Sequence, residues 1–416
     1  MRKVIAICGL VLAAVILIGS IAFAFSPLGN NLLTGLKNGG GTNTGSGTPV
    51  VNGGTPAPGS AGKGCGITKN GNSYSFSWLH VANGNIVASN NCVVDLVGFN
   101  WSQLEFGNAV GGGAKTRISE QSMAWYNQNF HMNVWRIPVN SDWWNNNVDV
   151  PLAHMQYQAW IEQVISWAKQ NGDYVILTKG PQFPNPPCGG TVKVCPSQNQ
   201  AGKDLKQEPS NVQLQQDVTT GQYIQSAVTM WDSIGRIYAN DPAVLYDSWN
   251  EMHNIDAQTW QNSENALING IRAQNPRSLV FLGGPNFKGN INALVQGQVP
   301  DFTQQNLVYD FHVYDGYTGT SMGKNCAEPM SDLWKDWPNT ANEQVGFAQQ
   351  HGKAVSFTEW GGCNDLATYN QDITSFAQTH HITLVYYDET NVATMTNGAY
   401  QLTSNGQEVQ AAYAKL

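Results

Sequence analysis

Two glutamates, Glu251 and Glu359, occupy positions where acid–base chemistry is possible. Glu251 lies in WNEMHN and Glu359 in TEWGG, and each motif ends a run that we predict to be a strand. Two carboxyl groups on different strands can act together on an acetal, because one protonates the leaving oxygen while the other attacks the anomeric carbon or activates water. The pair must differ in environment, so that one carboxyl is protonated and the other ionised.

Other polar and aromatic residues stand at predicted strand ends and could complete such a site. Arg136 in VWRIPV could keep a neighbouring carboxylate ionised, and Asn250 could hydrogen-bond a sugar hydroxyl. Aromatic rings can pack on the C–H faces of sugars. The further residues that we predict to bind substrate are His312, Tyr314, Trp101, Trp360 and Tyr386.

Eight apolar runs that alternate with helix-period stretches must position these residues. The predicted strands are 94–100, 133–139, 174–178, 244–249, 279–282, 307–312, 354–358 and 382–386. The predicted helices include 155–170, 223–239, 257–273, 343–351 and 369–379. Nearly continuous apolar strands that alternate with helices predict an α/β fold, a (β/α)₈ TIM barrel, whose active site lies at the carboxyl ends of the strands.

An open, doubly wound sheet is the rival fold for this pattern. It would usually place a glycine-rich phosphate-binding turn after its first strand, whereas the chain has GFNWSQLEFG there. A short hairpin of residues 74–79 and 85–88 is predicted before the barrel, and residues 182–211 are predicted to form a long loop after the third strand.

The N-terminal part of the chain differs from the rest. Residues 4–25 carry no charge and follow Arg2 and Lys3. Their length suits a membrane anchor, which needs about 20 apolar residues, while Ala22-Phe23-Ala24 resembles a signal-peptide cleavage site. We therefore predict a signal peptide or transmembrane anchor over residues 1–25, a flexible Gly/Ser/Thr/Pro-rich linker over 26–64 and a catalytic domain over 65–416.

Charge and cysteine content agree with export. Only 12% of the 416 residues are charged, and residues 65–416 carry a net charge of −12, which disfavours nucleic acid as a partner. Six cysteines follow the linker, an even number typical of disulfides outside the cell. Sequential pairing would join Cys65 to Cys92, Cys188 to Cys195 and Cys326 to Cys363, and no ligand spacing typical of zinc is present.

Taken in order, five motifs resemble glycoside hydrolase family 5. They are GFNWSQLEFG, the Arg of VWRIPV, the Asn-Glu of WNEMHN, the His-x-Tyr of HVYDGY and the Glu of TEWGG, within roughly residues 90–416. The resemblance implies a retaining (β/α)₈ enzyme with Glu251 as acid/base and Glu359 as nucleophile. It also implies that Asn250 contacts the sugar 2-hydroxyl, that Arg136 orients Glu359, and that His312 and Tyr314 line the sugar subsite.

This resemblance favours an endo-β-1,4-glucanase that acts on β-glucan or another β-1,4-linked polysaccharide. A β-mannanase and a non-catalytic carbohydrate-binding barrel are the alternatives, because three positions depart from the family pattern. Thr178-Lys179 replaces a usual His, Met252 a usual Pro, and Tyr386-Tyr387 a usual Trp. We expect no cofactor or metal, a monomer, an extracellular location, and membrane contact only through an uncleaved anchor.

Overall fold

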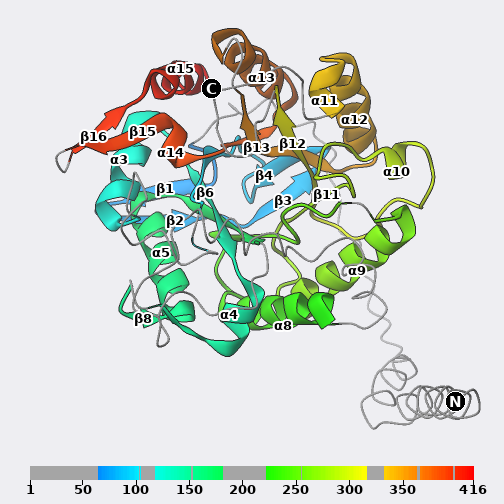
Figure 1. Cartoon of the computed structure of the whole chain (residues 1–416), viewed down its shortest axis with the longest axis horizontal. Coiled ribbons are helices and arrows are strands. Elements are labelled where there is room, and N and C mark those ends of the chain that lie inside the picture. The colour runs from blue at the N-terminus through cyan, green and yellow to red at the C-terminus, as the bar shows by residue number, and fades with distance from the viewer. Residues whose placement is uncertain are drawn as a thin grey trace, which may run out of the picture. The chain divides into compact units, whose positions relative to one another are not determined.

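Eight parallel strands close into a barrel, as predicted (Figure 1). The computed structural model describes residues 64–102, 104, 118–150, 153–180, 222–253, 255–315, 332–362, 366–396 and 399–416. In chain order the strands are β5 (Val97–Asn100), β6 (Val134–Val139), β9 (Tyr174–Lys179), β10 (Val244–Asp247), β11 (Val280–Gly283), β12 (Leu307–Tyr314), β13 (Ala354–Gly361) and β14 (Thr383–Tyr386). Each pairs with its neighbours along the chain, and β14 pairs with β5 to close the barrel.

Helices surround this barrel (Figure 1). They are α3 (Glu120–Phe130), α4 (Ser141–Asn146), α5 (Tyr157–Asn171), α8 (Gln222–Ile237), α9 (Ala257–Gln274), α10 (Asn292–Val295), α11 (Asp332–Lys335), α12 (Asn339–Gln350), α13 (Leu366–His380), α14 (Glu389–Val392) and α15 (Ser404–Tyr413). All five predicted helices are present. Two further two-stranded sheets join β7 (Asp149–Val150) to β8 (Met155–Gln156) and β15 (Ala393–Thr396) to β16 (Ala399–Leu402).

The region before the barrel forms two hairpins, where we predicted one. β1 (Ile67–Asn70) pairs with β2 (Ser73–Phe76), and β3 (Leu79–Ala82) pairs with β4 (Asn85–Ala88). The predicted hairpin of 74–79 and 85–88 was therefore wrong in its first strand, because residues 85–88 pair with 79–82. Asn83 and Gly84 explain the register, because both have positive φ values of 52° and 76° and form the two-residue turn that suits a tight hairpin.

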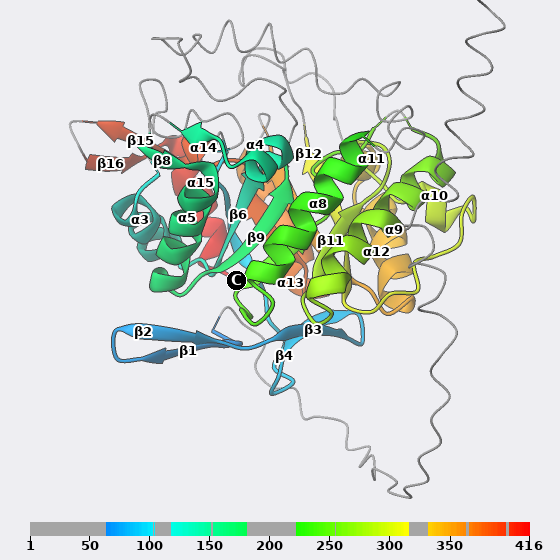
Figure 2. The same ribbon diagram turned by 90° about the horizontal axis from the view of Figure 1, so that it is seen from below.

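The hairpins lie together at one end of the barrel (Figure 2). Leu79 and Ile86 belong to the same buried apolar cluster as Val134 and Tyr174, which begin two of the barrel strands. The Tyr174 hydroxyl also donates hydrogen bonds to the carbonyls of Gly66 and Ser77. The hairpins thus cover the amino-terminal end of the strands and leave the carboxyl ends for the site.

Cys65 and Cys92 form a disulfide with a Cα–Cα distance of 5.8 Å, as predicted. The bond joins the start of the first hairpin to the segment that leads into β5. Cys188, Cys195, Cys326 and Cys363 lie outside the described residues, as do the segment 1–25, the predicted linker up to residue 63 and the predicted loop 182–211. In the part of the chain that the structure describes, no helix is both long enough and apolar enough to cross a membrane.

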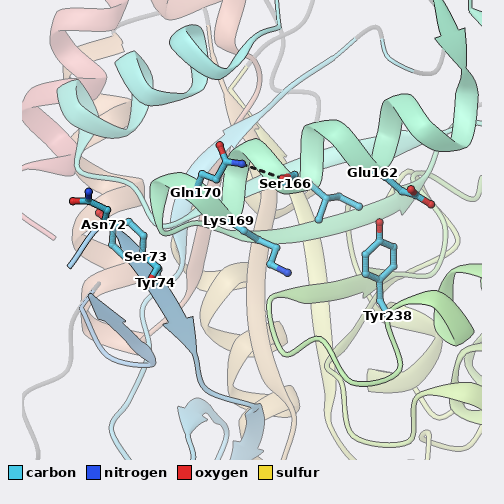
Figure 3. Close-up of a pocket in the computed structure, with 9 residues that line it drawn as sticks. Asn72, Ser73, Tyr74, Glu162, Ser166, Lys169, Gln170 and Tyr238 are labelled. Carbon is cyan, nitrogen blue, oxygen red and sulfur yellow. Dashed lines mark hydrogen bonds between the residues drawn. The ribbon is translucent and has the colours of Figure 1, made fainter. Parts of the chain in front are cut away.

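A cavity of about 350 Å³ lies between the first hairpin, α5 and Tyr238, the residue that directly follows α8 (Figure 3). Most of its lining residues are polar, among them Asn72 and Ser73 at the hairpin turn, Glu162, Ser166 and Lys169 on α5, and Tyr238. None of its lining residues is one of the predicted site residues. The predicted site residues lie elsewhere, most of them at or near the carboxyl ends of the strands.

Candidate active site

Arg136 of β6 lies inside the barrel and joins four strands. Only 2% of the residue is exposed. Its Nη1 donates to Glu359 Oε1 on β13 and to Asn100 Oδ1 on β5, both at 2.8 Å. Its Nε and Nη2 donate to Asp247 Oδ2 on β10 at 3.0 and 2.8 Å, and Nη2 also donates to Asn250 Oδ1 at 2.8 Å. The guanidinium therefore fixes the positions of two acids and two amides around it.

Glu359 is the buried carboxyl of the pair. Its Oε1 accepts from Arg136, and its Oε2 accepts from the Tyr314 hydroxyl at 2.7 Å. Burial raises the pKa of the Glu359 carboxyl above its usual value, and the Arg136 guanidinium and the Tyr314 hydroxyl offset only part of that rise. Burial also raises the pKa of Tyr314, so its hydroxyl stays protonated and donates a hydrogen bond to Glu359. Donors thus face both oxygens of Glu359, which suits an ionised carboxylate.

A β-bulge turns Glu359 toward the barrel interior. Asp310 pairs with Ser356 and His312 pairs with Glu359, so β13 has one more residue than β12 between these two pairs. The extra residue lets Thr358 and Glu359 both make contacts inside the barrel, whereas strict alternation would send one of them outward. Thr358 contacts Asp310 and His312, and Glu359 contacts Arg136.

Glu251 is the more exposed carboxyl, with 31% of its side chain accessible against 8% for Glu359. Its Oε1 lies 2.6 Å from His312 Nδ1, which is 3.5 Å from Glu359 Oε2. Burial and the nearby cations Lys288 and Arg136 lower the pKa of His312 well below its usual value, so the ring is neutral. One carboxylate oxygen of Glu251 lies within 4.8 Å of one of Glu359.

Comparisons with known proteins agree with this geometry. The family model described as Cellulase (glycosyl hydrolase family 5) matches residues 88–392, most of the chain. The chain belongs to glycosyl hydrolase family 5. The predicted family and barrel are thereby confirmed.

Two curated relatives illustrate the sequence similarity. Endoglucanase Z of Dickeya dadantii is 25% identical over 142 residues, which cover 33% of this chain and 28% of that protein. Endoglucanase 1 of Saitozyma flava is 36% identical over 118 residues, which cover 26% of this chain and 35% of that protein. This chain therefore matches only about a third of the length of each relative.

Solved structures of endoglucanases share the fold. The catalytic domain of Thermobifida fusca endoglucanase Cel5A has a TM-score of 0.54 at 15% identity and covers 81% of this chain and 97% of that chain. Endoglucanase Cel5A of Thermotoga maritima has a TM-score of 0.52 at 15% identity and covers 76% of this chain and 96% of that chain. At such low identity, these structures establish the barrel architecture alone.

The cluster of Glu251, His312 and Glu359 could also span a metal ion, since each offers a ligand atom within 4.8 Å of the others. The permanently charged Arg136 already donates to Glu359 at 2.8 Å and would repel a second cation. The donor set of this family 5 barrel therefore favours proton transfer over metal binding.

Three predicted substrate-binding aromatics lie apart from this cluster. Trp101, Trp360 and Tyr386 are at most 1% exposed. Trp101 packs against Trp135 at a ring distance of 5.1 Å, and Trp360 packs against Tyr386 at 4.8 Å. A ring that stacks on sugar needs an open face, so this burial argues against the predicted role for all three. By contrast, Tyr387 is half-buried and its ring centroid lies 6.4 Å from that of Tyr314.

A second group of charged residues lies beneath the cluster and was not predicted. Lys288 Nζ donates to Asp247 Oδ1 at 2.6 Å and to Asp310 Oδ2 at 2.7 Å, and all three side chains are at most 2% exposed. Lys288 enters from the loop after β11, where its φ is 55°. A Cβ on Gly283 would lie 2.1 Å from Lys288 Cγ, so glycine is required there. The Gly283-Gly284 pair was the only signal in the sequence.

Proposed function

We propose that the chain is a retaining endo-β-1,4-glycanase, with Glu251 as acid/base and Glu359 as nucleophile. The observation that carries this is the asymmetry of the two carboxyls. Glu359 is buried and accepts from Arg136 and Tyr314, while Glu251 is partly exposed beside a neutral histidine. Their oxygens approach within 4.8 Å, close to the roughly 5–5.5 Å carboxyl separation of retaining enzymes and shorter than that of inverting ones.

In the first step, Glu359 attacks the anomeric carbon while Glu251 gives its proton to the departing glycosidic oxygen. The bond from the anomeric carbon to that oxygen breaks, and an ester to Glu359 forms. In the second step, Glu251 takes a proton from water, the water oxygen attacks the same carbon, and Glu359 leaves as a carboxylate. Two inversions give net retention.

The remaining cluster residues orient the reactants. Arg136 donates to Glu359 and to the side-chain Oδ1 of Asn250. This contact leaves the side-chain Nδ2 of Asn250 to donate to a sugar hydroxyl. Tyr314 donates a hydrogen bond to Glu359, and this bond stabilises the negative charge of the carboxylate until the ester forms. Half-buried Tyr387, rather than Tyr386, is the ring that we propose to pack on the sugar.

The substrate that we propose is a β-1,4-glucan, because the curated relatives that match the chain are named endoglucanases. We also propose that the domain works outside the cytoplasm, since the Cys65–Cys92 disulfide suits an oxidising environment.

Release of reducing ends from carboxymethylcellulose, glucomannan and mannan tests this proposal. The wild-type protein should act on the two glucose-containing polymers. Glu359→Gln should lose at least about 10³-fold of this activity on every substrate, because no nucleophile remains. Glu251→Ala should lose roughly 10²–10⁴-fold on polysaccharide but much less on aryl glycosides whose leaving group needs no proton.

Each alternative has its own signature in this experiment. Activity on mannan alone would show that the protein is a mannanase and not a glucanase. Binding of oligosaccharide without any reducing-end release would favour a non-catalytic barrel, and equal losses in both variants on aryl glycosides would contradict the two roles.

A further inference from the structure

The hydroxyl of Thr358 lies between Asp310 and His312. Asp310 accepts from Lys288 Nζ, Ser356 Oγ, the Thr358 backbone N–H and Thr358 Oγ1. A carboxyl that accepts from four donors, one of them an ammonium, is ionised. The single hydroxyl proton of Thr358 is therefore committed to Asp310, and its oxygen can only accept from other groups.

His312 turns its Nε2 toward these acceptors. The Nε2 atom is 3.5 Å from Thr358 Oγ1 and 3.9 Å from Asp310 Oδ2. Without a proton, Nε2 would direct its lone pair at a hydroxyl lone pair and a carboxylate. Because the buried ring is neutral, it carries one proton. Placing that proton on Nε2 removes the repulsion and leaves Nδ1 as an acceptor.

An acceptor at Nδ1 requires a donor at the other end of its short contact. That contact is with Glu251 Oε1, at 2.6 Å. A carboxyl donates only when it is protonated. Glu359 Oε2 lies farther from Nδ1, at 3.5 Å, and donors face both oxygens of this carboxyl, which favours its ionised form.

We propose that Thr358 and Asp310 are positioning residues that fix His312 in its Nε2–H tautomer, so that Nδ1 holds Glu251 in the protonated form. The inference rests on the proposed function, in which Glu251 begins the cycle as an acid. After Glu251 has given its proton to the leaving oxygen, the bare Nδ1 beside it favours recovery of a proton from water. The tautomer of His312 is the same before and after a turnover.

The surrounding charges act in the same direction. The titratable and charged groups around Glu251 and His312 are Arg136 of β6, Lys288 after β11, Asp310 and Tyr314 of β12, Glu359 of β13, and Asp247 of β10, which pairs with both cations. Two cations thus stand against three carboxylates. An ionised Glu251 would add a fourth negative charge, which the protonated form avoids.

The pH dependence of kcat/KM on an unactivated cello-oligosaccharide tests the proposal, because its alkaline limb reports the acid of the free enzyme. Thr358→Val removes the hydroxyl and keeps the shape. The limb should move to lower pH by roughly half to one unit, the size that one net hydrogen bond gives. Thr358→Ser should restore the wild-type limb.

Ser356→Ala is the matched control. It removes a hydrogen bond of 2.7 Å to the other oxygen of the same Asp310 carboxylate and makes no contact with His312 in the described residues. Its limb should stay in place. An unshifted limb in folded Thr358→Val, or an equal shift in Ser356→Ala, would overturn the proposal.

The ¹⁵N NMR spectrum of wild-type protein with labelled histidine rings provides a test that needs no stable Thr358→Val variant. The His312 signals are assigned by their loss in His312→Asn. A proton on Nε2 supports the proposal and a proton on Nδ1 overturns it. These outcomes are separate from the proposed function, which fails if the wild-type protein is inactive or if Glu359→Gln remains active.

Discussion

The two faces of the barrel strands have opposite chemistry. Inside, Asn100, Arg136 and Glu359 are joined by hydrogen bonds of 2.8 Å. Outside, the chain neighbours Trp101 and Trp360 pack into an aromatic layer beneath the helices. Successive side chains of a strand point to opposite faces. Adjacent residues at one strand end therefore have different surroundings: one joins the polar network inside the barrel and the other packs beneath the helices.

Two buried glutamates show the same difference. Glu359, inside the barrel, has Arg136 at 2.8 Å. Glu264, on α9 outside it, is 1% exposed, and its Oε2 has no hydrogen-bond partner among the described residues. Burial raises the pKa of Glu264 to about 8. Burial raises the pKa of both carboxyls, but only Glu359 has a guanidinium and a tyrosine hydroxyl that stabilise its charged form.

The largest effect is expected from loss of the cation on the inner face. Arg136→Met leaves Asp247 and Glu359 without their guanidinium, so the free energy of unfolding should fall by about 3–5 kcal/mol. The remaining activity should fall at least about 100-fold, because Glu359 loses its orientation. Chemical denaturation and kcat/KM measure the two effects, and wild-type values for both would show that the inner network is dispensable.

On the outer face, Trp360→Leu should affect stability alone. The smaller side chain leaves a cavity among Tyr369, Tyr386 and Tyr413, which should cost about 2–4 kcal/mol. The KM and kcat of the folded protein should stay within about threefold of wild type. A raised KM at unchanged stability would show that Trp360 contacts substrate, as predicted from the sequence.

Near pH 4.5, Glu264→Gln should give the smallest change of the three variants, and the size of its effect on stability should depend on pH. The folded protein holds Glu264 protonated up to about pH 8, while the unfolded chain releases that proton near pH 4.5. The wild-type free energy of unfolding therefore falls as pH rises between these values.

Glutamine removes this loss, so Glu264→Gln should be more stable than wild type at pH 8, by up to roughly 4 kcal/mol. The difference should vanish near pH 4.5. Urea denaturation at the two pH values measures it, and a constant difference would contradict a protonated Glu264.

The sequence predicted the barrel well because its eight strands are apolar runs with both faces covered. Helix α15 was not predicted from the sequence, because the segment begins SNGQEV. Gly406 stands there because a Cβ would lie 1.9 Å from the Val392 carbonyl oxygen. No periodic pattern encodes such a close approach.

The six polar residues predicted for the site do come together: Glu251, Glu359, Asn250, Arg136, His312 and Tyr314. The predicted aromatics Trp101, Trp360 and Tyr386 are buried instead. Trp101 and Trp360 directly follow Asn100 and Glu359, so strand alternation turns these two rings to the other face. Lys288 was not predicted, because the Gly283-Gly284 pair alone does not indicate that a loop with positive φ at Phe287 and Lys288 brings this side chain to the interior.

The anomeric form of the first product tests the central claim most directly. Glu251 and Glu359 stand within 4.8 Å and should act by double displacement. Proton NMR during hydrolysis of a β-linked cello-oligosaccharide should show the β-anomer first, with the α-anomer appearing later by mutarotation. An α-anomer formed first would contradict Glu359 as the nucleophile.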